Sequence, residues 1–130
     1  KRFGPEHPAT ADSRRRLAQH LFYNEYYEEA LGLAQRALAT YERSRPLDED
    51  HLATALLGVV EILLEMQRGR EALPMATRVL SIRSQRREPG HTDVAEAHSR
   101  LGIALLQSGL PAQALSQGQL AHDILLRTLG

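Results

Sequence analysis

Internal repetition is the feature that most constrains the fold of this chain, because a repeated sequence favours a repeated structural unit. The segments 25–38, 68–80 and 110–122 align without gaps at a spacing of 42 residues. The same spacing relates seven sets of small or apolar residues, namely Leu17, Val59 and Leu101; Ala18, Val60 and Gly102; Leu21, Leu63 and Leu105; Ala30, Ala72 and Ala114; Leu31, Leu73 and Leu115; Ala34, Ala76 and Gly118; and Ala37, Val79 and Ala121. The chain is therefore built from one unit used three times.

Each repeat, at approximately 4–46, 47–89 and 90–130, has the apolar spacing of two amphipathic helices. Leucine and alanine provide 39 of the 130 residues, and this composition favours helix over strand. One helix pair cannot bury its apolar stripe alone, so the pairs must stack on one another. We therefore predict an all-α fold of six antiparallel helices, arranged as three helix–turn–helix pairs within one domain.

Local signals mark where these helices begin and end. Breaks near Asn24, Gly69 and Gly109 separate the two helices of each repeat. Pro111 suits a first helical turn, where its missing N–H costs little. Asp50 suits the beginning of a helix, where the helix dipole favours a carboxylate. The small residues at fixed repeat positions are expected to let adjacent helices approach closely.

Composition and charge exclude several classes of function. Sixteen basic residues balance sixteen acidic ones, which argues against a nucleic-acid-binding surface. The absence of cysteine excludes disulfides and thiolate metal sites. The sequence has no apolar run long enough to span a membrane and no signal-peptide pattern, so we expect a cytoplasmic protein without membrane contact. Fifteen of the sixteen basic residues are arginine, which suggests a bacterial source, and the start at Lys1 suggests a piece of a longer protein.

Four segments carry a resemblance to a known family: GPEHPATA (4–11), DHLATA (50–55), EALPMATRVLSI (71–82) and GHTDVA (90–95). Together with the small residues at fixed positions, they resemble the tetratricopeptide repeat, in the long-repeat subclass found in kinesin light chains. The usual period of the family is about 34 residues. The resemblance implies a right-handed superhelix, or α-solenoid, that serves as a non-catalytic protein–protein interaction scaffold and holds a peptide or helix in its concave groove.

The chain departs from the subclass at two places. An Asn often precedes the Leu-Ala pair of the first helix in each repeat, where this chain has Arg16, Gly58 and Arg100. Such an Asn commonly helps to hold a peptide backbone in the family. His51 lies two residues late relative to His7 and His91, and this shift predicts a longer loop before the second repeat.

The recurring histidines could suggest a metal site, but their spacing argues against one. A zinc ion needs three or four ligands at about 2 Å. Residues one repeat apart in a solenoid are separated by about 10 Å, the distance between packed helices. We therefore predict no metal and no cofactor, and we expect His7, His51 and His91 to form loop hydrogen bonds near helix starts.

The clearest candidate for a binding surface is the first helix of each repeat. In the repeat frame, Arg15, Arg16 and Gln19 should face the concave side, while Leu17 and Ala18 face the core. Such arginines could grip a carboxylate or an acidic peptide through bidentate contacts, or they could form a solvated face with salt bridges to nearby acidic side chains: Asp12, Glu61 and Glu96. The predicted partner-binding residues are Arg15, Arg16, Gln19, Tyr23, Glu61, Arg100 and Gln107.

The aromatic side chains and the last helix add two further expectations. Tyr23 falls at the groove end of its helix, whereas Tyr26 and Tyr27 fall at a turn that aromatics commonly fill. These aromatic residues therefore allow two interpretations: they form a binding hot spot, or they fill the end of the helix stack. The last helix carries Leu126 and Leu129 with few polar residues around them. Because a solenoid needs a polar cap, this helix predicts either a further repeat or a homodimer through the uncapped ends.

No motif for catalysis is present, since G-x-S-x-G, the P-loop, H-E-x-x-H and G-x-G-x-x-G are all missing. We therefore predict that the chain is not an enzyme and that its partner is a protein or peptide. The alternative prediction is a self-associating or conformation-relaying segment of a larger bacterial signalling or regulatory protein.

Overall fold

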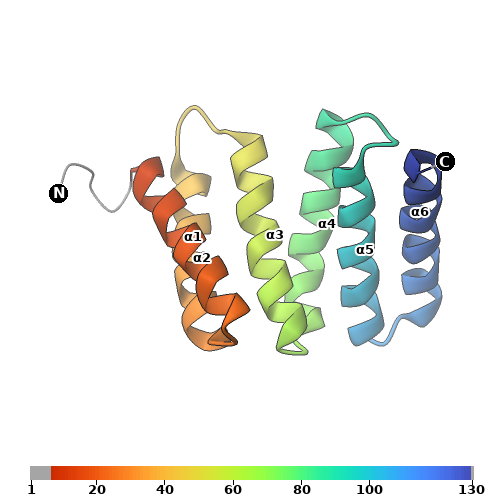
Figure 1. Cartoon of the computed structure of the whole chain (residues 1–130), viewed down its shortest axis with the longest axis horizontal. Helices are drawn as coiled ribbons and strands as arrows, with labels where there is room; N and C mark the ends of the chain where they lie inside the picture. The colour runs from red at the N-terminus through yellow and green to blue at the C-terminus, as the bar shows by residue number, and fades with distance from the viewer. Residues whose placement is uncertain (1–6, 130) are drawn as a thin grey trace.

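The computed structural model describes residues 7–129, which form six α-helices and no strands. Residues 4–6 and Gly130, at the ends of the predicted repeats, lie outside the described part. The helices are α1 (Pro8–Tyr23), α2 (Tyr27–Arg43), α3 (Glu49–Glu65), α4 (Gly69–Arg86), α5 (Thr92–Gln107) and α6 (Pro111–Leu129). They stand side by side as three antiparallel pairs, from α1 and α2 at one end to α6 at the other (Figure 1). The predicted all-α repeat solenoid is confirmed.

Each helix packs against the next along the chain, and two further contacts join α1 to α3 and α3 to α5. The odd-numbered helices therefore share one face of the stack, which we call the inner face. The core between the layers is made of leucine, valine, isoleucine and alanine side chains, and α3 contributes the largest fully buried ones, including Leu52, Leu56 and Leu63. Within the described residues no helix is long and apolar enough to cross a membrane.

The turn inside each pair has the same backbone conformation in all three repeats. Glu25, Gln67 and Gly109 have positive φ angles of 66°, 60° and 82° and are spaced 42 residues apart. The next amide N–H reaches back five residues, as from Tyr26 to the carbonyl oxygen of Leu21 at 2.9 Å. This is the hydrogen-bond pattern that closes helices with a left-handed residue. The repeat of the sequence is therefore a repeat of turn geometry as well.

The predicted hydrogen bonds of the three histidines near helix starts are confirmed, and at two positions the histidine itself caps the helix. Nδ1 of His7 accepts a hydrogen bond from the backbone N–H of Ala9, and Nδ1 of His91 accepts one from that of Asp93, each at 3.0 Å. Both histidines cap the helix that follows.

The second repeat uses a different cap. The carboxylate of Asp48 accepts the backbone N–H of His51 at 3.1 Å and contacts its imidazole at 2.7 Å. The longer loop that the position of His51 predicted is absent, because loops 44–48 and 87–91 have the same length. Asp48 begins the helix earlier than His51 would, and His51 becomes part of the first turn.

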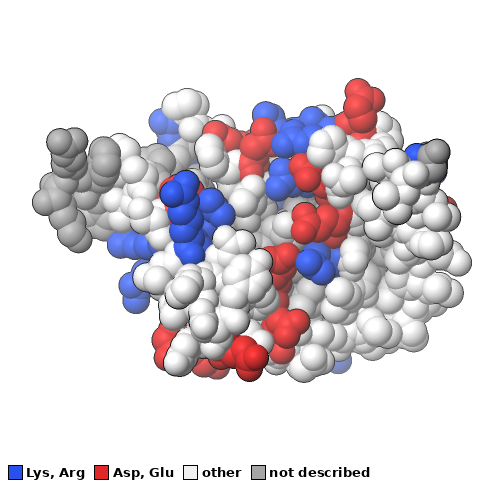
Figure 2. All heavy atoms as spheres, viewed as in Figure 1, with Lys and Arg blue, Asp and Glu red and all other residues white. Residues whose placement is uncertain are grey.

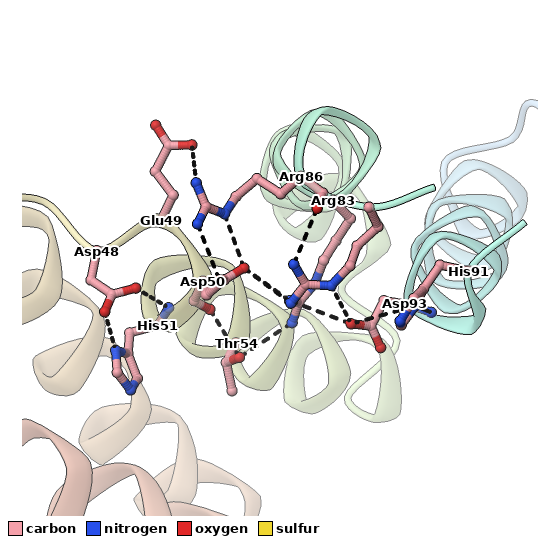
Figure 3. Close-up of polar contacts among 10 residues, drawn as sticks. Asp48, Glu49, Asp50, His51, Thr54, Arg83, Arg86, His91 and Asp93 are labelled. Atoms are coloured by element: carbon pink, nitrogen blue, oxygen red, sulfur yellow. Dashed lines mark hydrogen bonds and ion pairs between the residues drawn. The ribbon is translucent and has the colours of Figure 1, made fainter. Parts of the chain in front are cut away.

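An ion-paired cluster, the arginine seam, ties the second repeat to the third: Arg83, Arg86 and Arg87 with Asp50 and Asp93. Nε and one terminal nitrogen of Arg86 donate to the two carboxylate oxygens of Asp50 at 3.1 and 3.2 Å. Arg87 bridges Asp50 and Asp93 at 3.1 and 3.2 Å. The arginines end α4 and the carboxylates begin α3 and α5, so each charge also suits its helix dipole (Figure 3).

The same two repeat positions form a junction between successive units, with different chemistry each time. In the second junction the guanidinium of Arg83, only 9% exposed, lies 3.7 Å from Asp93 and donates to the hydroxyl of Thr54 at 3.2 Å. In the first junction Tyr41 replaces the arginine and stacks on His51, with ring centroids 5.8 Å apart. Each junction therefore joins the last turns of one unit to the first turn of the next.

The two ends of the described stack are open, and one of them corrects a prediction. Leu17 was expected in the core, yet it is 49% exposed, whereas Val59 and Leu101 at the same repeat position are buried. A preceding helix covers the latter two, and no described helix precedes α1. At the other end Leu115 is 63% exposed, whereas its equivalent Leu31 is 5% exposed beneath α3.

Small residues permit close helix contacts, as predicted. A Cβ added to Gly69 would lie 2.4 Å from Cβ of Gln107 and 3.0 Å from the carbonyl oxygen of Ala104. One added to Gly102 would lie 3.3 Å from the carbonyl oxygen of Ala114. The beginning of α4 therefore touches α5 closely, and α5 approaches the backbone of α6.

Candidate functional site

The inner face carries three adjoining cavities, which together we call the inner groove. The first, of about 270 Å³, lies between α1 and α3 and reaches Glu96 on α5. The second, of about 450 Å³, lies near the intrarepeat turns and shares Phe22, Tyr23 and Glu61 with the first. The third, of about 340 Å³, lies along the beginning of α5 and shares Glu96 with the first and Arg100 with the second. The shared residues make one continuous surface across α1, α3 and α5.

Six of the seven predicted partner-binding residues line this groove. They are Arg15, Gln19, Tyr23, Glu61, Arg100 and Gln107. Arg16 does not line it: its side chain is 74% exposed and pairs with Asp12 at 3.0 Å.

The groove has an apolar floor and an aromatic end. Ala18 and Ile62 are buried beneath it. The ring of Tyr23 is 71% exposed at the junction of two cavities and lies 5.6 Å from the ring of Phe22. Tyr26, which was expected to fill the turn, is exposed on the surface instead, while Tyr27 is half-buried against the core. An exposed aromatic ring beside an apolar floor is a surface that a partner could cover.

Both guanidinium groups of the groove are already paired within the chain. A terminal nitrogen of Arg15 donates to Asp12 at 2.9 Å, and this hydrogen bond is the main reason why the pKa of Asp12 lies below its usual value. A terminal nitrogen of Arg100 donates to Glu61 at 3.0 Å. The predicted salt bridges to Asp12 and Glu61 are confirmed, whereas the one to Glu96 is absent from the described residues.

Glu96 is the residue of this site that the predicted set missed. Its side chain is open to solvent, yet the groove walls desolvate the carboxyl and raise its pKa, and the Glu61 carboxylate raises it further. No hydrogen bond or ion pair holds Glu96 in the described part of the chain. Its spacing could have revealed it, because Glu96, Arg100 and Gln107 fall on one face of a helix.

Two buried polar atoms of the second cavity have no hydrogen-bond partner among the described residues: Nε of Arg100 and Oε1 of Gln107. The amide nitrogen of Gln107 donates to the carbonyl oxygen of Leu64 at 3.1 Å, so this side chain also joins α5 to α3. Buried polar groups are normally satisfied. The polar network of the groove is therefore incomplete within the chain.

The arrangement suits binding rather than chemistry. The groove combines paired arginines, carboxylates, an amide and a tyrosine. No group of three His, Cys, Asp or Glu side chains in residues 7–129 is placed to hold a metal ion. What the groove offers is an apolar floor, a charged wall and an exposed ring.

Comparison with known proteins places this geometry in context. The family model described as tetratricopeptide repeat matches residues 51–127. These residues make up more than half of the chain and span the second and third helix pairs. A search of curated proteins found no match.

Solved structures show the same fold. A protein of Podosopora anserina, described as a kinesin light chain with nearly identical repeats, has 19% identity and a TM-score of 0.80, covering 99% of this chain and 61% of its own. BtubC (BKLC) of P. vanneervenii has 21% identity and a TM-score of 0.82, covering 97% of this chain and 50% of its own. This chain therefore spans half to about three fifths of the length of these structures.

Proposed function

Because this chain belongs to the tetratricopeptide repeat family, whose members are in general protein–protein interaction modules, we propose that it binds a peptide or helix of a partner protein in the inner groove. One observation carries the proposal. Side chains that are far apart in the sequence, on three different helices, line three connected cavities together. The family is a scaffold without catalysis, and we extend that property to this chain.

The composition of the groove supports a peptide as the occupant. Tyr23 offers a large ring that loses little side-chain entropy when it is covered, and tyrosine is enriched among residues that dominate binding energy. Arg100 and Gln107 offer polar groups beside this ring. Protein interfaces have the same arrangement, with an apolar centre and a polar rim. A length of three helix widths suits a short extended or helical segment.

An acidic partner, which the arginines suggested, has little support. The guanidinium groups of Arg15 and Arg100 already contact Asp12 and Glu61, and Arg16 lies outside the groove. An incoming carboxylate would have to displace an intramolecular carboxylate at each site. Such an exchange gives little net binding energy.

The test selects random short peptides displayed on phage against the immobilised protein. We expect Tyr23→Ala to weaken the selected peptides by about 2 kcal/mol, the scale of a hot-spot residue. Tyr26→Ala is the matched control, since Tyr26 is also exposed but lines none of the three cavities. Equal binding by both variants, with unchanged melting temperatures, would show that the groove is not the binding surface.

A second candidate function is self-association through the open end of the stack, as a self-associating or relaying segment of a larger regulatory protein. The right-hand end of the surface in Figure 2, over α6, has almost no charged side chains. Leu115, Leu126 and Leu129 are exposed there. Light scattering over a dilution series discriminates: a dimer that Leu126→Glu dissociates supports this function, and a monomer at every concentration rejects it.

A further inference from the structure

The charges that line the inner groove are unequal in number. Its three cavities are lined by four carboxylates, Glu61, Glu65, Asp93 and Glu96, and by two guanidinium groups. Figure 2 shows acidic side chains along the middle of this face, with arginine side chains among them. The chain as a whole is neutral, so the excess of negative charge is a local property of the groove.

Ion pairs within the chain occupy both of these guanidinium groups and two of the four carboxylates, Glu61 and Asp93. The guanidinium of Arg15 contacts Asp12 at 2.9 Å and that of Arg100 contacts Glu61 at 3.0 Å. Glu65 and Glu96 have no hydrogen bond or ion pair within residues 7–129. The charged groups still free to meet a ligand at the first two cavities are therefore carboxylates.

We propose that the inner groove selects a peptide segment that carries an arginine or lysine, received by the unpaired carboxylate of Glu96, next to an aromatic or aliphatic side chain that covers Tyr23. This inference rests on the proposed function and specifies the chemistry of its partner. Glu96 and Glu61 line the same cavity from α5 and α3, and Tyr23 lines it from α1. A cation placed beside Glu96 would form a charge-assisted contact in the cavity that Tyr23 also lines.

The electrostatics of Glu96 agree with this assignment. Burial and the neighbouring Glu61 carboxylate raise the pKa of Glu96, while Arg100 lowers it. The charged groups that act on it are Glu61 on α3, Arg83 on α4, and Asp93 and Arg100 on α5, with Arg15 of α1 in the same cavity. Desolvation and repulsion disfavour the bare carboxylate, and the attraction of a cation from a partner would offset both effects.

The test compares the peptides that the wild-type protein, Glu96→Gln and Glu29→Gln select from the same random phage-displayed library. Glu29 is an exposed carboxylate at the beginning of α2 and lines none of the three cavities. We expect the wild type and Glu29→Gln to enrich arginine and lysine beside an aromatic or aliphatic residue. Glu96→Gln should bind the same basic peptides about tenfold more weakly, as the loss of one charge-assisted contact predicts.

Each other outcome has a defined meaning. If the selected peptides need Tyr23 for binding but are acidic or uncharged, this inference is overturned and the proposed function stands. No enrichment above the Tyr23→Ala variant would reject both. Equal binding of basic peptides by wild type and Glu96→Gln, with melting temperatures unchanged, would also overturn it.

Discussion

A left-handed residue stands at the same place in each of the three turns, and only the third is glycine. A non-glycine residue in this conformation costs about 1 to 2 kcal/mol, part of which is regained because glycine loses more entropy on folding. We expect Glu25→Gly to raise the free energy of unfolding by about 0.5 to 1 kcal/mol. Gly109→Ala should lower it by about 1 kcal/mol. Urea unfolding measures both changes.

Gly32→Ala is the control for that pair of variants. Gly32 lies inside α2, and a Cβ added there would meet nothing within 4 Å. Alanine should therefore stabilise this position through helix propensity alone, by up to about 1 kcal/mol. A loss of stability in Glu25→Gly would mean that the Glu25 side chain contributes more than its backbone costs.

At this scale the sequence predicts best where a residue acts on its own helix. His7 and His91 were expected near helix starts and cap them. Arg16 was predicted to face the groove, whereas its exposed side chain pairs with Asp12, because the repeat frame fixes which residues are equivalent but not the direction of each long side chain. Glu96 was missed for the opposite reason: its importance comes from the absence of a partner, which depends on every helix around it.

At the scale of elements, the arginine seam holds α3, α4 and α5 together at one edge. Asp50 contacts Arg86 and Arg87 and begins α3, and the hydrogen bond from Arg86 is the main reason why its pKa lies below the usual 3.8. Because the pKa of Asp50 is lower in the folded state than in the unfolded state, the carboxylate stabilises the fold at pH values above its unfolded-state pKa. That contribution is lost as the pH falls through the folded, lowered value.

We therefore expect Asp50→Asn to lower the free energy of unfolding by about 0.5 to 1 kcal/mol near neutral pH, the range of a solvent-screened ion pair. The difference from wild type should shrink at high salt and vanish in acid, where Asp50 is protonated in the wild type too. Thermal unfolding at several pH values and salt concentrations checks this. Glu88→Gln, at an exposed loop residue that forms no ion pair within residues 7–129, should change little.

The helices themselves were predictable, because their number, order and pairing follow from apolar spacing and turn signals. The seam was not, although Asp50 was correctly expected at a helix start. Its arginines lie more than thirty residues from Asp50 along the chain. The antiparallel pairing of α3 with α4 brings Arg86 and Arg87 to Asp50, and the packing of α5 against α4 brings Asp93 to the same arginines. These contacts follow from helix packing, and no local sequence pattern encodes them.

At the scale of the whole molecule, stability depends on which units cover a given position. Leu31 is buried between successive pairs, whereas Leu115 at the equivalent position has no described helix over it. We expect Leu31→Ala to cost about 2 to 5 kcal/mol, as core leucines do. Leu115→Ala should change the free energy of unfolding by less than about 0.5 kcal/mol.

Chemical unfolding of the dilute protein measures both variants. A large loss for Leu115→Ala would mean that a second molecule covers this leucine under the conditions used. The same experiment therefore tests the solenoid arrangement and the self-association alternative. The exposure of Leu17 and Leu115 could not be predicted from the repeat, since a repeat pattern states only what equivalent residues share.

The junctions between units give the stack a fixed order. Tyr41 meets His51 at the first junction, and Arg83 meets Asp93 at the second, at equivalent positions of the repeat. If α2 and α4 exchanged places, a guanidinium would face an imidazole and a phenol would face a carboxylate. The units therefore share one architecture, yet exchanging them would replace the contact at both junctions, so their order along the stack has its own side-chain chemistry.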